Sequence, residues 1–379
     1  MLRLNKPIIL YLLVLITAAT VAYGESGCRY FWVVRDGLAS PRQVDRLLER
    51  AQAAGANGIL VQVVGRGEAY YQSEILPPAD FSGFEDPLAY IIQEAGPMGM
   101  EVHAWVNAYL VWSAPWLPES PDHIYHRHPE WFTASRNGRS SRSYTRDEAE
   151  AAGLVGATLS PAYPGVKEYI SGIAVEIAEN YNIDGIHLDY IRYPNSSFGY
   201  SPGEVELFQI ATGFSPEEAP EQWGIWRQHQ VTETVATVRT ALRSVDPGVL
   251  LSCAVMANPY SAASEFSCDW QSWLNQGLVD FVCPMAYTSN TRRALELASS
   301  TTSVCPEKVV YGIGVWNQTV DNSLVGAEKA LQLGAGGICV FSLNSLPEGT
   351  EQMLKNRWGE GSSPEHGVSP AYFNTVRLP

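Results

Sequence analysis

A short stretch near the middle of the chain carries residue types that acid–base chemistry needs. In the run DGIHLDYIR, residues 184–192, His187 and Asp189 are separated by the apolar Leu188. In an extended strand this spacing puts both polar side chains on one face and the apolar ones on the other. An ionised carboxylate on an inward face is costly unless it is paired or used, and Arg192 is near enough to pair with it. Asp189 is therefore a candidate catalytic carboxylate, with a structural Asp189–Arg192 pair as the alternative.

Other stretches of the chain repeat this arrangement. Residues 101–108 alternate in the same way, so His103, Trp105 and Asn107 share one phase. Polar residues on the inward phase of two strands indicate a binding site, although a single histidine there is more often a satisfied core residue. Polar groups that gather with flat rings suit a sugar ring. The candidates for substrate contacts are Gln62, Arg66, Tyr71, His103, Trp105, Asn107, His187, Arg192, Met285, Tyr287 and Trp316.

Glycosyl transfer is the reaction that these groups suit. It needs one group to protonate the leaving oxygen and one to take up the developing positive charge. We assign Asp189 the second task, as nucleophile or charge-stabilising carboxylate. Glu68 and Glu74 are the candidate acids, and an ordinary surface glutamate is the alternative for each. A carboxyl separation of about 5 Å would indicate retention, and one of about 6.5–9.5 Å inversion. If the substrate carries N-acetyl groups, Tyr287 is the residue that we expect to orient one.

The elements that must position these residues alternate along the chain. Apolar, β-branched runs predict strands, and amphipathic runs that begin at Ser-Pro or Asp-Pro and end near Gly predict helices. The predicted strands are 29–35, 58–64, 101–108, 184–191, 249–256, 279–286, 308–314 and 336–343. The predicted helices are 41–54, 86–98, 164–180, 222–244, 269–276, 291–302, 322–333 and 347–356.

This alternation predicts an α/β fold, a (β/α)8 TIM barrel over residues 25–358. Continuous apolar strands are typical of a parallel sheet that is covered on both faces. A dinucleotide-binding sheet would need a Gly-rich turn after the first strand, and Arg35-Asp36-Gly37 is not one. In such a barrel the site lies at the carboxyl ends of the strands. The long loop after strand three, about 111–161, is expected to be either a wall or lid over the site or a peripheral subdomain with its own core.

The amino-terminal segment of the chain predicts an exported protein. Arg3 and Lys6 precede an apolar stretch, 7–22, and small residues allow cleavage after Gly24, so residues 1–24 are interpreted as a signal peptide. An uncleaved membrane anchor is the alternative. Residues 359–379 show little periodicity and are expected to form a tail. We expect a periplasmic or extracellular protein with no membrane span after cleavage.

Composition excludes several classes of function. The chain has 379 residues, with 40 Asp and Glu against 25 Lys and Arg, a formal charge of −15. A phosphate backbone would be repelled, so nucleic-acid binding is disfavoured. No cofactor is expected, and the imidazoles of His123, His126 and His128 lack the further ligands of a metal site. A polysaccharide or oligosaccharide is the expected partner.

The six cysteines permit disulfides in an exported chain. Three of them, Cys253, Cys283 and Cys339, lie in apolar strand-like runs and are interpreted as small buried hydrophobes. Cys268 and Cys305 fall outside the predicted strands. They are therefore the candidate pair for a disulfide.

Five segments of the sequence resemble the glycosyl-hydrolase-like family 10, a group of exported bacterial barrel proteins of the DUF187 type. They are 62–71 (QVVGRGEAYY), 101–109 (EVHAWVNAY), 128–131 (HPEW), 184–194 (DGIHLDYIRYP) and 279–287 (VDFVCPMAY). The resemblance implies a glycosidase that acts on bacterial glycans, with peptidoglycan strands as a substrate class, and adds Tyr109 to the candidate binding residues. Two positions depart from the pattern, since Glu68 and Ser160 stand where aspartate is expected.

A second resemblance fails at the catalytic position. The run 184–194 looks like the strand-four signature of family 18 chitinases, whose catalytic glutamate would fall at Ile191. An isoleucine cannot donate a proton, so chitinase chemistry in that form is excluded. The sequence thus predicts an exported glycoside hydrolase that cleaves the O-glycosidic bonds of a bacterial polysaccharide, an amino-sugar glycan such as peptidoglycan strands. A non-catalytic glycan-binding protein on the same barrel is the alternative, and an enzyme of phosphorylated metabolites is weakly supported.

Overall fold

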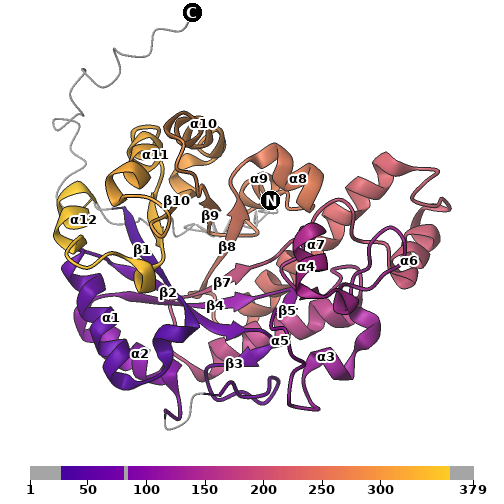
Figure 1. Ribbon diagram of the computed structural model, residues 1–379, viewed down its shortest axis with the longest axis horizontal. Coiled ribbons are helices and arrows are strands. Elements are labelled where there is room, and N and C mark those ends of the chain that lie inside the picture. Colours follow the sequence, from indigo (N-terminus) through magenta and orange to yellow (C-terminus); the bar gives the residue numbers. More distant parts are fainter. Residues whose placement is uncertain (1–26, 81–83, 359–379) are drawn as a thin grey trace, which may run out of the picture.

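The computed structural model describes residues 27–80 and 84–358 (Figure 1). The predicted signal peptide, 1–24, and the predicted tail, 359–379, lie outside the described residues. Among the helices that the structure describes, none is long and apolar enough to cross a membrane.

Eight parallel strands among the described residues close into a barrel. Each pairs with its neighbours in the sheet, and β1 pairs with both β2 and β11, which joins the two edges. The predicted (β/α)8 barrel is thereby confirmed, and each predicted strand is found within two residues at either end. The barrel strands are β1 (Cys28–Val33), β2 (Gly58–Gly65), β4 (Glu101–Asn107), β7 (Gly185–Asp189), β8 (Leu250–Met256), β9 (Phe281–Met285), β10 (Val310–Gly314) and β11 (Gly337–Phe341).

The helices of the outer layer begin where the sequence signals predict. Ser40 and Asp86 accept hydrogen bonds from Gln43 and Ala89, and each is followed by a proline in the first turn. The predicted helices are α1 (Pro41–Ala53), α2 (Pro87–Ala95), α5 (Pro164–Asn180), α7 (Pro220–Val245), α9 (Trp270–Asn275), α10 (Thr291–Thr301), α11 (Val320–Gln332) and α12 (Glu351–Trp358). Further elements are β3 (Glu68–Ala69), β5 (Leu110–Trp112), β6 (Ala157–Thr158), α3 (Ile124–Arg127), α4 (Arg146–Ala151), α6 (Pro202–Thr212) and α8 (Pro259–Phe266).

The alternation of each strand separates two cores. Outward-facing residues pack against the helices in one large cluster, and inward-facing residues such as Trp32, Trp105 and Cys283 form a second cluster inside the barrel. Glycines at inward positions make room for large rings. A Cβ on Gly185 would lie 2.2 Å from the His103 ring, and one on Gly312 would lie 2.9 Å from the Trp32 ring. The interior is therefore packed with rings.

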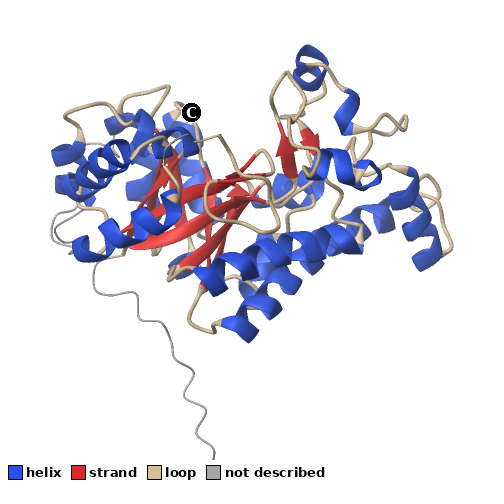
Figure 2. Cartoon of the chain, turned by 90° about the horizontal axis from the view of Figure 1, so that it is seen from below, coloured by secondary structure: helices blue, strands red, loops and turns tan. Residues whose placement is uncertain are grey.

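The long loops after β4 and β7 join to form a lobe, residues 110–162 and 194–219, beside the barrel (Figure 1). Its short antiparallel pair, β5 with β6, stands apart from the barrel strands in Figure 2. Backbone hydrogen bonds from Gly199 and Tyr200 to the carbonyl of Ala134 connect the two loops. Leu154 and Phe198 belong to a small core within the lobe, whereas Trp112, Phe132 and Leu159 of the same lobe pack into the large outer core of the barrel.

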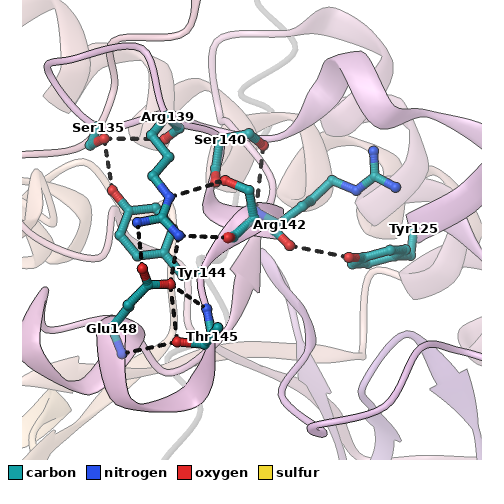
Figure 3. A network of polar contacts seen from close by, with 9 residues as sticks. Tyr125, Ser135, Arg139, Ser140, Arg142, Tyr144, Thr145 and Glu148 are labelled. Atoms are coloured by element: carbon teal, nitrogen blue, oxygen red, sulfur yellow. Dashed lines mark hydrogen bonds and ion pairs between the residues drawn. The ribbon is translucent and has the colours of Figure 1, made fainter.

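An ion pair between Arg139 and Glu148 connects two parts of the first loop of the lobe (Figure 3). The Arg139 guanidinium contacts both carboxylate oxygens of Glu148, at 3.1 and 2.6 Å. Glu148 also accepts from the backbone of Thr145, so it completes the capping box of α4. Arg139 lies over the Tyr144 ring at 4.1 Å. These contacts are local and occupy the arginine within the lobe.

The cysteines are all free thiols. Cys253, Cys283 and Cys339 are fully buried, which confirms their interpretation as small buried hydrophobes. The predicted disulfide between Cys268 and Cys305 is wrong. Cys268 is fully buried beneath α8, whereas Cys305 lies in a surface turn, where its thiol contacts Asn275.

Candidate active site

Asp189 is the last residue of β7 and lies opposite Asn107 in the pairing with β4. Both side chains are on the inward phase, at the carboxyl end of the barrel. Asp189 is only 6% exposed. Its Oδ1 accepts a 2.6 Å hydrogen bond from the backbone N–H of Tyr190, a residue with a left-handed φ of +51°. Non-glycine residues seldom adopt this conformation, and the surrounding structure must hold them in it.

The charge of Asp189 is only loosely compensated. Burial raises the pKa of its carboxyl, while the Arg192 guanidinium, the Tyr190 N–H and the Trp105 indole act in the opposite direction. The Arg192 nitrogen stays 3.9 Å from Oδ1, and its guanidinium lies over the Tyr190 ring at 4.8 Å. Within the described residues, neither that Arg192 nitrogen nor Trp105 Nε1 completes a hydrogen bond of ordinary geometry. Two buried donors beside the carboxylate therefore have hydrogen-bonding capacity that no described acceptor uses.

His187 and His103 lie deeper in the barrel than expected for residues that contact a substrate. Both are fully buried. His187 Nε2 accepts from the Trp32 indole at 3.1 Å, and its Nδ1 contacts Ser252 Oγ at 2.9 Å. Burial lowers the pKa of His187 well below its usual value, so the ring is neutral. Each ring nitrogen of His187 thus has a core partner, which corrects its assignment as a binding residue.

His103 lies at the amino end of the barrel. Its ring packs against Tyr30 and Phe281, with centroid distances of 5.4 and 5.7 Å. Its Nε2 is 3.4 Å from Glu101 at the start of β4. The inward phase was predicted correctly, but the depth was wrong because position along the strand decides which end a side chain reaches.

A polar chain runs across the carboxyl ends of β1, β2 and β4. The Arg35 guanidinium donates to Gln62 Oε1 at 3.3 Å, and Gln62 Nε2 donates to Asn107 Oδ1 at 3.4 Å. Gln62 and Asn107 are buried, at 3% and 7% exposure. The structure therefore brings together Gln62, Asn107 and Asp189, which the sequence analysis proposed from three separate runs.

Aromatic rings occupy the other half of this end of the barrel. Tyr287 contacts Trp316 edge to face at 5.0 Å, and both contact Phe341 at the end of β11, at 5.5 and 5.4 Å. Phe341 also approaches Trp105 and Trp32. Trp316 is 48% exposed, so one side of its ring is open. The open side of the Trp316 ring offers a flat apolar face on which a sugar ring can stack.

Met285 lies in the same group. It is the last residue of β9 and is half-buried against the rings that fill the barrel. Tyr287 packs against the same interior cluster, so the two candidate residues lie together.

Glu68 lies on a hairpin that extends β2. Residues Arg66 and Gly67 form the two-residue turn between β2 and β3, with φ of +58° and +68°, and Glu68 pairs opposite Gly65. Burial raises the pKa of the half-buried Glu68, against the nearby charges of Arg66 and Arg35. A raised pKa favours the protonated form that a general acid requires.

Glu74 is placed differently. Its side chain is exposed, and its backbone N–H donates to Glu176 of α5 at 2.6 Å. Tyr71 donates to the same Glu176 at 2.8 Å and is buried in the outer core. The predicted substrate contact by Tyr71 is thereby corrected, because its hydroxyl is already bound on the helix side of the sheet.

Tyr109 also belongs to the outer core, fully buried on the helix side of the barrel. Burial raises the pKa of its hydroxyl above the usual value. The family resemblance therefore extends to a tyrosine that packs the core, not one that faces the interior of the barrel.

Three residues of the site were not predicted from the sequence. Arg35 follows β1, while Trp32 and Phe341 are inward residues of β1 and β11. For strands three and four, candidates were chosen because they share the inward phase or follow the end of the strand. The same rule applied to the first and last strands would have found Arg35, Trp32 and Phe341.

The clustered histidines of the lobe each bind a different neighbour. His123 Nε2 contacts the Arg66 carbonyl at 2.7 Å, His126 contacts the Pro118 carbonyl at 2.8 Å, and His128 stacks on Trp131. Within residues 27–80 and 84–358, no three histidine, cysteine or acidic side chains are grouped to hold a metal ion.

Comparison with solved structures shows the same TIM-barrel fold in two glycoside hydrolases. The PgaB (BpsB) glycoside hydrolase domain from Bordetella bronchiseptica matches with a TM-score of 0.69 at 16% identity, over 88% of this chain and 99% of that domain. An α-L-fucosidase from Paenibacillus thiaminolyticus matches with a TM-score of 0.60 at 14% identity, over 89% of this chain and 50% of that one. Identities this low establish the fold alone.

The sequence then places the chain within one family. Residues 31–329 match the model of the glycosyl hydrolase-like 10 family, and the chain belongs to that family. It is 26% identical to glycosyl hydrolase DigH of Escherichia coli K12 over 279 residues, 65% of this chain and 58% of that protein. It is 24% identical to glycosyl hydrolase YngK of Bacillus subtilis over 286 residues, 68% of this chain and 52% of that protein. The chain thus spans little more than half the length of these curated relatives.

Proposed function

We propose that this protein is an exported glycoside hydrolase that cleaves O-glycosidic bonds of a bacterial polysaccharide, with amino-sugar glycans such as peptidoglycan strands as its substrates. The observation that carries the proposal is Asp189, a buried carboxyl at the carboxyl end of β7 beside two donors without acceptors. The names of the relatives and the family support the same class of reaction. The basic and apolar run at 3–22 supports export.

The chemistry divides between two carboxyl groups. Asp189 acts as the nucleophile or the carboxylate that stabilises the oxocarbenium-like transition state. Glu68 is the better of the two candidate acids, since burial raises its pKa and it lies on the hairpin that extends β2. Glu74 is less suitable because its side chain is exposed and its backbone is held against α5.

Substrate contacts divide in a similar way. Trp316, Tyr287 and Phe341 offer rings on which a pyranose stacks. Arg192 and Trp105 donate to hydroxyl or carbonyl oxygens of the sugar bound beside Asp189. In an N-acetylated substrate, Tyr287 orients the acetamido group.

A non-catalytic glycan-binding protein is the second candidate. One observation favours it: β8, β9, β10 and β11 end without an aspartate or glutamate that could act as the second carboxyl group. Such a protein would keep the aromatic rings and the donors but would cleave nothing.

The test is reducing-end release from denuded peptidoglycan strands and poly-N-acetylglucosamine by the native protein and by Asp189→Asn. We expect the variant to lose about two orders of magnitude or more in kcat/KM, because one interaction of the transition state is removed. Product masses identify the bond that is cut. Equal rates would reject Asp189 as the catalytic carboxylate, and binding without release by both proteins would favour the glycan-binding alternative.

A further inference from the structure

The imidazole of His123 lies between the lobe and the turn of the β2–β3 hairpin. His123 immediately precedes α3 and is fully buried. Its ring packs edge to face against Trp112 of β5, with the ring centroids 5.2 Å apart. One ring nitrogen contacts backbone of the lobe, and the other contacts backbone of the hairpin. A buried side chain of the lobe thus contacts the segment that carries Glu68.

These two hydrogen bonds determine where the ring proton of His123 resides. Nδ1 accepts from the backbone N–H of Tyr125 at 3.0 Å, which caps the first turn of α3. A ring nitrogen that accepts carries no proton, so the proton of the neutral ring resides on Nε2. Nε2 therefore donates to the Arg66 carbonyl at 2.7 Å. Burial lowers the pKa of His123, which favours this neutral ring.

The turn of the hairpin fits closely against the lobe. Arg66 and Gly67 both have left-handed backbone, with φ of +58° and +68°. A Cβ on Gly67 would lie 2.7 Å from His123 Nε2 and 3.2 Å from the Val111 carbonyl oxygen, so glycine leaves the space that the imidazole fills. The Arg66 side chain also contacts the lobe, from Nε to Ser113 Oγ at 3.4 Å. The bond from His123 is the shorter of these two contacts.

Glu68 follows this turn directly and depends on it for its position. Its strand, β3, consists of Glu68 and Ala69 and is shorter than most strands. Beyond the strand, the backbone N–H of Tyr70 donates to the Val63 carbonyl at 2.8 Å, which holds the far end of the hairpin. At the turn itself, His123 supplies the corresponding fixed point.

We propose that His123 is a positioning residue: its bond to the Arg66 carbonyl fixes the hairpin so that the Glu68 carboxyl protonates the leaving group. The inference rests on the proposed function, in which Glu68 is the acid. A general acid acts only within hydrogen-bonding reach, and a misplacement of about 1 Å costs about 10²-fold in rate. His123 acts through the hairpin and takes no part in the proton transfer.

Two substitutions separate the two hydrogen bonds of His123. In His123→Asn, the amide oxygen takes the place of Nδ1 and still caps α3, but the side chain ends short of the Arg66 carbonyl. In His123→Gln, the amide nitrogen takes the place of Nε2 and still donates to that carbonyl, but the cap is lost. Both variants lose the ring that packs against Trp112, so that loss is common to the pair.

The measurements are hydrogen–deuterium exchange of the backbone amides of residues 65–70 and hydrolysis of two substrates by the full chain. The substrates are denuded peptidoglycan strands and an aryl glycoside whose leaving group needs no protonation. His126→Asn is the control, since this exposed histidine of the lobe also contacts a carbonyl, that of Pro118 at 2.8 Å. It should match the native protein in exchange at the hairpin and in both kcat values.

In His123→Asn we expect the hairpin amides to exchange about 10-fold faster, because the turn opens more often. On the strands, kcat should fall about 10- to 100-fold with KM within about twofold of native. On the aryl glycoside, kcat should fall less than about threefold, because no proton is transferred to the leaving group. His123→Gln should retain native exchange at the hairpin and native kcat, with a lower Tm from the lost cap.

The double variant of His123→Asn with Glu68→Gln tests whether His123 acts through Glu68. It should hydrolyse the strands no more slowly than Glu68→Gln alone, because the acid is already absent. A further loss in the double variant would overturn the proposal.

Native exchange at the hairpin in His123→Asn would overturn the proposal whether or not the native protein hydrolyses glycans. Equal losses of kcat in His123→Asn and His123→Gln would also overturn it, because the ring would then act only through packing. Faster exchange in His123→Asn alone, in a protein that hydrolyses neither substrate, would reject the proposed function and support the hold of His123 on the hairpin.

Discussion

The indole N–H of Trp32 donates a 3.1 Å hydrogen bond to Nε2 of His187 in the interior of the barrel. The ring proton of His187 therefore resides on Nδ1, which donates to Ser252 Oγ at 2.9 Å. Ser252 Oγ is in turn 3.4 Å from the Ile186 carbonyl. The adjacent strands β7 and β8 are joined through one neutral imidazole to β1 on another side of the barrel. His187 supports the strand that ends in Asp189.

This bond predicts an acid-sensitive contribution to stability. Burial lowers the pKa of His187 in the folded protein, whereas the unfolded chain titrates near 6.5. Below about pH 6.5 the unfolded chain binds a proton that the folded protein does not, so stability falls as the pH falls. The slope is about 1.4 kcal/mol per pH unit until the lowered pKa is reached. Urea unfolding of the native protein and His187→Gln at pH 7.5, 6.5 and 5.5 measures it.

The glutamine variant should be less stable at pH 7.5 but should lose less free energy of unfolding on acidification. His229→Gln, an exposed histidine of α7, is the matched control and should follow the native pH dependence. Parallel curves for the native protein and His187→Gln would contradict the prediction.

Removal of the Asp189 charge should stabilise the protein. Burial raises the pKa of Asp189 above its unfolded value of about 3.9. Between the unfolded pKa and the raised pKa, the folded protein binds more protons than the unfolded chain does. Stability therefore falls as the pH rises through this range. Asp189→Asn removes the buried charge, and we expect a gain of about 0.5–2 kcal/mol at pH 7. Calorimetric Tm values at pH 7 and pH 4 measure the effect, which should be larger at pH 7. A lower Tm at pH 7 would instead identify a structural Asp189–Arg192 pair.

The two candidate acids should behave differently. Glu68→Gln removes the proton donor that we assign to the leaving group, and we expect kcat/KM on a glycan to fall about 10²- to 10⁴-fold. The loss should be much smaller on an aryl glycoside whose leaving group needs no protonation. Glu74→Gln should change kcat/KM by less than about twofold, because the Glu74 carboxyl is exposed and only its backbone contacts Glu176.

Kinetics of both variants on the two substrates test this assignment, with Glu49→Gln on the exposed face of α1 as the control. If Glu74→Gln were the inactive variant and Glu68→Gln retained activity, the roles would have to be exchanged. A loss on the glycan and the aryl glycoside alike would show that Glu68 does not act as the acid.

The aromatic rings of Tyr287, Trp316 and Phe341 should contribute more to substrate binding than to turnover. Trp316 is 48% exposed and contacts Tyr287 at 5.0 Å, so its ring can be removed without opening the core. Trp316→Ala should raise KM roughly 3- to 10-fold, the equivalent of about 0.5–1.5 kcal/mol, and leave kcat nearly unchanged. Phe214→Ala, at an exposed position after α6, should leave both constants as they are. A fall in kcat with unchanged KM would place Trp316 in the transition state instead.

Periodicity determined most of the barrel because the signals are local. The strand runs and the proline-initiated helices fixed eight strands and eight helices in order, and a parallel sheet of that length closes into a barrel. The elements that were not predicted are short or depend on the lobe, such as α8 and the pair of β5 with β6. Their sequences lack the long apolar repeats on which a prediction depends.

The alternation of strand four also determined which side chains of 184–192 point inward, and the strand-exit rule indicated the end of the barrel at which Asp189 lies. The alternation of side chains along a strand does not indicate how deep in the barrel a residue lies or how a loop curves. Only the tertiary structure decided that His103 and His187 are core residues, that Tyr71 and Glu74 lie against α5, and that Arg35 contacts Gln62 of the site. These placements depend on contacts between residues far apart in the chain, which form only when the barrel closes and brings its first and last strands together.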